Sequence, residues 1–90
     1  MGLPTNRIAA RAVIFRMAYV PMYRLILRDI RTQIDRGLLK PGDKIPTTKE
    51  LADKYDTSPG TARKAVEILL EAGILEGRQG LGVFVPESQP

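Results

Sequence analysis

The 90-residue sequence contains neither cysteine nor histidine. Without cysteine, the chain can form no disulfide framework and no thiolate metal site. Without histidine, it lacks the commonest general base and the commonest metal ligand in proteins. The ten Asp and Glu residues are scattered, and most recur at helical spacings that suit solvated helix faces. The sequence therefore predicts no enzymatic activity, and no cofactor or metal site, in this chain.

Long hydrophobic runs are also absent. The most apolar stretch near the amino terminus, residues 8–20, is interrupted by Arg11 and Arg16. No stretch therefore reaches the length of a membrane-spanning helix, and no uninterrupted core of a signal peptide remains. We expect a protein without a membrane partner and with a cytoplasmic location.

Acidic residues are missing from the first part of the chain. Residues 1–28 contain no Asp or Glu but carry Arg7, Arg11, Arg16, Arg24 and Arg28. The whole chain has a net charge of +4 and a pI of about 9.8, and this basic balance favours a polyanionic partner. The apolar content of 43% is ordinary for a globular domain. A chain of this length makes one small domain, without room for a large enclosed active site.

Residues 47–72 have the pattern of two short helices joined by a tight turn. Thr47 can cap the first helix, and Glu50 can reach back to the N–H of the cap, which is a capping box. Ser58 can cap the second helix, and Pro59 occupies its first position, where a missing N–H costs nothing. The apolar stripe of this second helix consists of Ala62, Ala65, Val66, Leu69 and Leu70. With its polar, basic amino end, the pair predicts a helix-turn-helix whose recognition helix spans 59–72.

A longer helix is predicted before this motif. Apolar residues at helical spacing begin after Pro21, which we expect to be the first helical residue, and continue to Gly37, which suits a left-handed helix end. The following segment, 38–46, is predicted to be a loop with a short strand at residues 44–45.

A β-hairpin is predicted after the motif. Two short apolar runs surround the glycine-rich stretch 78–82, which forms the tip in this interpretation and carries Arg78. After a helix-turn-helix, such a hairpin is a wing. The predicted fold is therefore mainly α with a small β-hairpin (α+β), a winged helix-turn-helix of three helices plus wing.

The chain divides into one domain with short flanks. We expect the domain over residues 21–86 and a polar tail, or the start of a linker, over 87–90. Residues 1–20 form a basic extension that has two open interpretations. It is either an arm that lies on DNA phosphate, or a helix or strand that packs on the domain and shows its arginines to solvent.

Three motifs together carry a family resemblance: P-G-D-x-x-P at 41–46, the capped helix-turn-helix from residue 47, and R-Q-G-x-G-x-F-V at 78–85. With them, residues 20–86 resemble the amino-terminal winged helix-turn-helix domain of the GntR family of bacterial transcription regulators. The resemblance implies a regulator, a repressor in this interpretation, that binds double-stranded DNA at near-palindromic operators as a homodimer. It also implies that a small-molecule effector binds to a carboxyl-terminal domain absent from this chain. Alone, we expect a monomer or a weak dimer with reduced operator affinity.

The resemblance also implies DNA-binding positions, with the recognition helix in the major groove and the wing at the minor groove. The candidate residues are Lys49, Ser58, Pro59, Gly60, Thr61, Arg63, Lys64, Arg78, Gln79 and Gly80. Arg63 is long enough to fork onto a guanine edge or to clamp a phosphate. Free N–H groups at the start of the recognition helix favour phosphate. For Ser58 the alternative is a cap alone, for Thr61 an ordinary first-turn residue, and for the two lysines a solvated charge.

Three residues depart from the family pattern. Pro59 and Lys49 stand where arginine is frequent in the family. Pro59 therefore offers no hydrogen-bond donor, and Lys49 lacks the bidentate geometry of arginine. Asp56 stands where the turn commonly has glycine, and Asp tolerates the left-handed conformation at some cost. We expect altered or relaxed base preference that rests on Arg63, the wing and phosphate contacts.

Two other interpretations remain open. A winged helix can serve as a protein–protein interaction module that does not bind DNA, because a fold does not fix a function. The chain can also be the amino-terminal part of a longer enzyme, since one branch of the family is fused to an aminotransferase-like domain.

Overall fold

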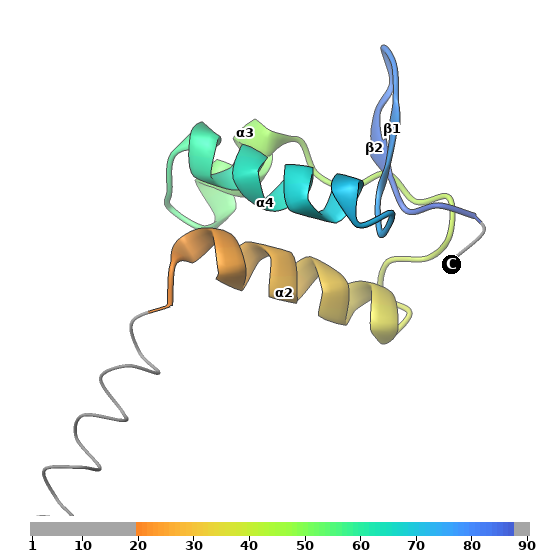
Figure 1. Cartoon of the computed structure of the whole chain (residues 1–90), viewed down its shortest axis with the longest axis horizontal. Coiled ribbons are helices and arrows are strands. Elements are labelled where there is room, and N and C mark those ends of the chain that lie inside the picture. The colour runs from red at the N-terminus through yellow and green to blue at the C-terminus, as the bar shows by residue number, and fades with distance from the viewer. Residues whose placement is uncertain (1–19, 88–90) are drawn as a thin grey trace, which may run out of the picture.

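The computed structural model describes residues 20–87. Three helices come first, namely α2 (Met22–Asp35), α3 (Thr48–Lys54) and α4 (Pro59–Glu71), and an antiparallel hairpin of β1 (Glu76–Arg78) and β2 (Gly82–Phe84) follows. In Figure 1 the hairpin projects from the layer formed by α3 and α4, and α2 lies on the other side of that layer. The predicted three helices plus wing are confirmed. Both interpretations of residues 1–20 fall almost entirely outside the described residues.

The helix ends follow from their local sequences. The Thr47 amide donates to Glu50 Oε1 at 2.9 Å, and the Glu50 amide donates to Thr47 Oγ1 at 3.1 Å, so the predicted capping box is present. The bond from the Thr47 amide holds the pKa of Glu50 below its ordinary value. Gly37 has φ of 74° after α2, as predicted. Pro21 precedes α2 as its N-cap, with ψ of 140°, and is therefore not the first helical residue.

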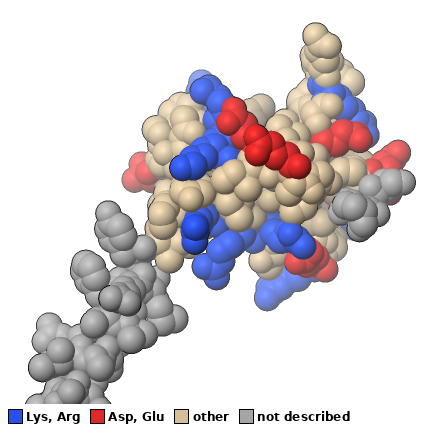
Figure 2. Space-filling model, in the orientation of Figure 1, with Lys and Arg blue, Asp and Glu red and all other residues tan. Residues whose placement is uncertain are grey.

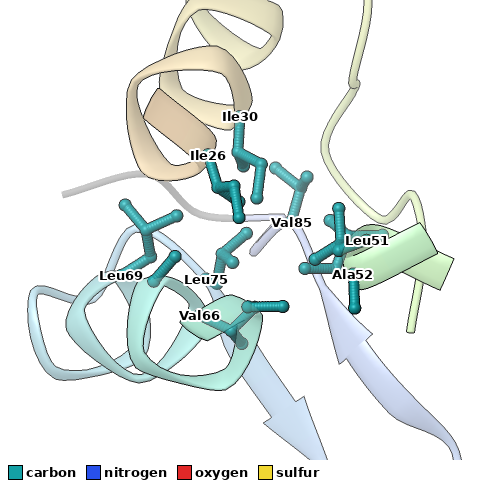
Figure 3. Packing of buried hydrophobic residues seen from close by; sticks show 11 residues of the cluster. Ile26, Ile30, Leu51, Ala52, Val66, Leu69, Leu75 and Val85 are labelled. Carbon is teal, nitrogen blue, oxygen red and sulfur yellow. The ribbon is translucent and has the colours of Figure 1, made fainter. Parts of the chain in front are cut away.

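The core lies where the three helices meet the base of the hairpin. Figure 3 shows Ile26 and Ile30 of α2 pointing toward α4, with Leu75 between them and Val66 and with Val85 beside Ile30. Ile26 and Val85 are fully buried. Burial of each such side chain stabilises the fold by roughly 1.5–3 kcal/mol. This packing fixes α4 against α2 and leaves the opposite side of α4 in solvent.

The hairpin is longer, and its tip shorter, than the sequence suggested. Arg78 pairs with Gly82 as the last rung of the ladder, so the tip comprises only residues 79–81. The prediction of a tip over 78–82 that carries Arg78 was wrong by one residue at each end. Pairing continues to this rung because a tight turn closes the tip: the Leu81 amide donates to the Arg78 carbonyl at 2.9 Å, and Gly80 has φ of 78°.

A third short segment extends the hairpin. Lys44 forms an antiparallel bridge with Phe84, the Ile45 amide donates to the Val83 carbonyl at 2.9 Å, and the Val85 amide donates to the Asp43 carbonyl at 2.8 Å. The expected strand at residues 44–45 is reduced to this one bridge. It nevertheless ties the loop before α3 to the wing. Within residues 20–87, no helix has the length and apolar character needed to cross a membrane.

Candidate nucleic-acid interface

The amino end of α4 presents two hydroxyl groups to solvent. Ser58 Oγ accepts a hydrogen bond from the Thr61 amide at 3.2 Å and lies 2.9 Å from Thr61 Oγ1. Only one of the two hydroxyls donates in that contact, so the hydrogen of the other remains available to an external acceptor. Ser58 is thus a cap, as predicted, and the pair still offers one donor at the positive end of a helix.

The Gly60 amide is the free backbone donor of this helix end. Pro59 has no N–H, the Thr61 amide is bonded to the cap, and the Ala62 amide donates to the Ser58 carbonyl at 3.2 Å. Among the described residues, none accepts from the Gly60 amide. An added Cβ at Gly60 would meet only Ser58 Oγ, at 3.9 Å, so a ligand can approach this backbone closely. A free amide without a side chain beside it is a suitable phosphate donor.

Arg63 and Lys64 are adjacent on α4 but lie in different surroundings. Both are exposed. Lys64 Nζ lies 4.1 Å from the centroid of the Tyr23 ring on α2, whereas Arg63 has no hydrogen bond, ion pair or ring contact within residues 20–87. Lys49, near the start of α3, is likewise exposed and without such a partner there. Arg63 and Lys49 are therefore available to a ligand without losing an intramolecular contact.

The turn between α3 and α4 is fixed to α2. The Tyr55 hydroxyl donates to Asp29 Oδ2 at 2.7 Å, across 26 residues of sequence. Burial, together with the Asp29 carboxylate, raises the pKa of Tyr55 well above its ordinary value. Asp56 has φ of 52°, so the residue that replaces glycine in this turn does adopt the left-handed conformation. The tether and the turn set the direction of α4 relative to the core.

The wing tip offers exposed polar backbone, and the arginine beside it already has partners. Gln79 and Gly80 are exposed, and Gly80 has φ of 78°. Arg78 Nε lies 3.0 Å from Glu76 Oε2, and its guanidinium carbon lies 4.4 Å from the centroid of the Phe84 ring. Arg78 is thus held against the strands and does not extend freely from the tip.

Two features of the wing were missed by the sequence reasoning. Leu81 at the tip is 62% exposed, and Lys44 runs along the wing so that an added Cβ on Gly82 would lie 2.7 Å from Lys44 Cε. Leu81 occupies a variable position of the R-Q-G-x-G-x-F-V motif. The sequence suggested a strand near Lys44 but held no signal for its pairing partner.

Basic side chains are not confined to the amino end of α4 and the wing. Figure 2 shows Lys and Arg gathered along the side formed by α2, and acidic side chains crossing the front of the molecule. The α2 side carries Arg24, Arg28, Arg31 and Arg36. Charge alone therefore does not locate a DNA surface, and the free donors of α4 and the wing are the more specific evidence. In the described part of the chain, no group of three or more Asp and Glu residues could hold a metal ion.

Comparisons with known proteins agree on one family. The model described as "Bacterial regulatory proteins, gntR family" matches residues 22–85. The mannosyl-D-glycerate transport/metabolism system repressor MngR of Escherichia coli (strain K12) is 45% identical over 73 residues, which are 81% of this chain and 30% of that protein. The HTH-type transcriptional repressor YtrA of Bacillus subtilis (strain 168) is 35% identical over 68 residues, 76% of this chain and 52% of that protein. The chain thus spans between about a third and a half of these relatives.

Solved structures show the same fold. A GntR family transcriptional regulator from Listeria monocytogenes superposes with a TM-score of 0.74 at 33% identity, over 78% of this chain and 61% of that one. The AraR DNA-binding domain, solved in complex with operator ORX1, superposes with a TM-score of 0.72 at 36% identity, over 77% of this chain and 83% of that one.

Proposed function

Because the chain belongs to the gntR family of bacterial regulatory proteins, we propose that residues 22–85 bind near-palindromic operator DNA as one half of a homodimer. In this proposal α4 enters the major groove and the β1–β2 hairpin lies at the minor groove. The domain is that of a DNA-binding transcription regulator, and the family comprises regulators rather than enzymes. The observation that carries the proposed orientation is the solvent-exposed amino end of α4, where the Gly60 amide and Arg63 have no partner within residues 20–87.

The proposed contacts divide into positioning and reading. The Gly60 amide and the free hydroxyl of the Ser58–Thr61 pair bind backbone phosphate, which sets the register of α4 on the duplex. Arg63 reads a base edge or clamps a phosphate, and Lys49 acts as a point charge on phosphate. The backbone at Gln79 and Gly80 approaches the minor groove.

Two of the candidate DNA-binding residues already have partners within the domain. Lys64 lies over the Tyr23 ring, and Arg78 is paired with Glu76 and packed on Phe84. A direct contact with DNA would require each of them to leave, or to share, its present partner. Pro59 is exposed at the first position of the helix and contributes shape without any donor. Base preference is therefore expected to depend on Arg63 and the wing.

The wider role follows the relatives. MngR and YtrA are named repressors, and we propose that this protein also represses transcription. These relatives are about two to three times longer than the segment that they share with this chain, and we propose that a segment beyond residue 90 binds a small-molecule effector and holds the homodimer. A two-fold protein suits a near-palindromic operator. We also propose that the protein acts in the cytoplasm, where a bacterial regulator meets its DNA target.

The proposal is tested by measuring the affinity of the chain for DNA by fluorescence anisotropy at several salt concentrations. The two duplexes are the one from upstream of the protein's own gene, called the native duplex, and a scrambled duplex. The wild-type chain should prefer the native duplex. Arg63→Ala should reduce this preference by about 5- to 150-fold, which corresponds to the 1–3 kcal/mol of one good base contact. Arg36→Ala removes the same charge from the end of α2 and is the matched control, expected to retain the preference. Absence of binding at low salt would overturn the proposal in favour of a protein–protein module.

A further inference from the structure

One face of the wing includes Lys44 from the loop before α3. Neither the P-G-D-x-x-P motif nor its position in the loop indicated that Lys44 lies there. Lys44 bridges Phe84, Phe84 pairs with Glu76, and Gly82 pairs with Arg78. Cross-strand partners, and residues two apart on one strand, project from the same face of a sheet. These five residues therefore share one face of the wing.

The contacts on that face agree with this register. Arg78 reaches both Glu76 and the Phe84 ring. The Lys44 stem crosses the position where a side chain on Gly82 would stand, with its Cε 2.7 Å from an added Cβ. Glycine at position 82 thus leaves open the path along which Lys44 extends from the edge of the wing toward the tip.

Lys44 also lies between two parts of the proposed interface. A cavity of about 310 Å³ is lined by Lys44 and Gly82 on the wing side and by Thr47 and Thr48 at the start of α3. The start of α3 precedes Lys49, and the wing ends in the tip at residues 79–81. A phosphate that reaches Lys44 would therefore lie between the contacts proposed for α3 and those proposed for the wing tip.

The charge of Lys44 is available to such a ligand. Lys44 is exposed and takes part in no hydrogen bond or ion pair within residues 20–87. It acts on Glu50 only at a distance, as the smallest of the causes that lower the pKa of that carboxyl. Within the described part of the chain, its positive charge is therefore not neutralised by a close partner.

We propose that Lys44 binds a DNA backbone phosphate at the edge of the groove that receives the wing, on the face that it shares with Arg78 and Gly82. This inference rests on the proposed DNA binding and adds a phosphate contact to it. A lysine on phosphate supplies affinity and a dependence on salt, without base preference. It thereby compensates in affinity for the donor that Pro59 does not provide.

The test is the slope of log affinity against log salt for wild type, Lys44→Gln and Lys44→Arg on the native duplex. Loss of one phosphate contact should make the slope less steep by about 0.9. If the two proteins bind equally well at 1 M salt, the variant should bind about eightfold more weakly than the wild type at 0.1 M salt. The loss should be equal on native and scrambled duplexes. Lys44→Arg should retain the wild-type slope.

Lys40→Gln is the matched control, because Lys40 is an exposed lysine four residues earlier in the same loop. An unchanged slope in Lys44→Gln, or an equal loss in Lys40→Gln, would overturn the inference while leaving DNA binding in place. Failure of the wild-type chain to bind either duplex would overturn both proposals. Thermal unfolding of each variant shows whether the fold is retained, and the exposure of both lysines predicts that it is.

Discussion

Replacement of Gly60 by alanine should separate the stability of this domain from its affinity for DNA. Gly60 has ordinary helical backbone geometry, and an added Cβ would meet only Ser58 Oγ, at 3.9 Å. Alanine therefore fits without strain and restricts the unfolded chain. The gain should be about 0.5 kcal/mol, at the low end for such changes because the position is in the first turn. For a domain of this size, the melting temperature should rise by about 2–4 °C.

The same methyl group should weaken binding to DNA. It would stand beside the Gly60 amide, which is the free donor of the helix end, and would keep a phosphate at a greater distance. A hydrogen bond to a charged group contributes roughly 1.5–3 kcal/mol, so the affinity should fall by about 10- to 150-fold. Circular dichroism at 222 nm measures the melting temperature, and fluorescence anisotropy with the native duplex measures the affinity.

Thr32→Ala is the control for this experiment. Thr32 is exposed on α2, and alanine there also improves helix propensity without approaching the amino end of α4. This variant should be more stable and should bind DNA as the wild type does. If Gly60→Ala gains stability and keeps its full affinity, phosphate does not approach the start of α4 as closely as the account requires.

Three further substitutions test other parts of the account. Pro59→Arg restores a donor at the start of α4 and should change which operators are selected from a randomised pool, so an unchanged selection would mean that position 59 does not face bases. Ser58→Ala removes the oxygen that accepts from the Thr61 amide, and the free energy of unfolding should fall by about 1 kcal/mol in a denaturant titration. Tyr55→Phe removes the hydrogen bond to Asp29 and the ionisable hydroxyl. Because the pKa of Tyr55 is raised in the folded state, the wild type should lose stability as the pH rises above about 10. An equal loss of stability in the Tyr55→Phe variant would show that Tyr55 does not cause it.

The amino ends of α3 and α4 could be predicted because their causes are local. The capping box at Thr47 and the cap at Ser58 lie within four residues of the groups that they satisfy, and both are present. Such features depend on neighbours in the sequence and need no knowledge of the packed domain.

The environment of the candidate DNA-binding residues could not be predicted in the same way. The ring beneath Lys64 belongs to Tyr23, and the stem of Lys44 lies against Gly82, so each contact joins residues about 40 apart in the chain. Both depend on how α2 and the loop before α3 pack on the rest of the domain. The extent of the hairpin depends on its register, which the glycine-rich tip left open by one residue on each strand. Residue type thus indicated the candidate site, and packing decided which of its charged side chains have partners among the described residues.

Placement of the wing at the minor groove can be measured directly with a DNA-cleaving reagent attached to a cysteine. Because the sequence contains no cysteine, a single introduced cysteine places the reagent at a known position. Gln79→Cys puts the reagent on the wing tip, and Thr32→Cys puts it on α2, away from the proposed interface. The Gln79 label should cut the native duplex at a defined site on both strands, with the offset typical of a minor-groove reagent, and the Thr32 label should not. Equal cleavage from the two labels, or none from the wing tip on a duplex that the labelled chain binds, would contradict the proposed orientation on DNA.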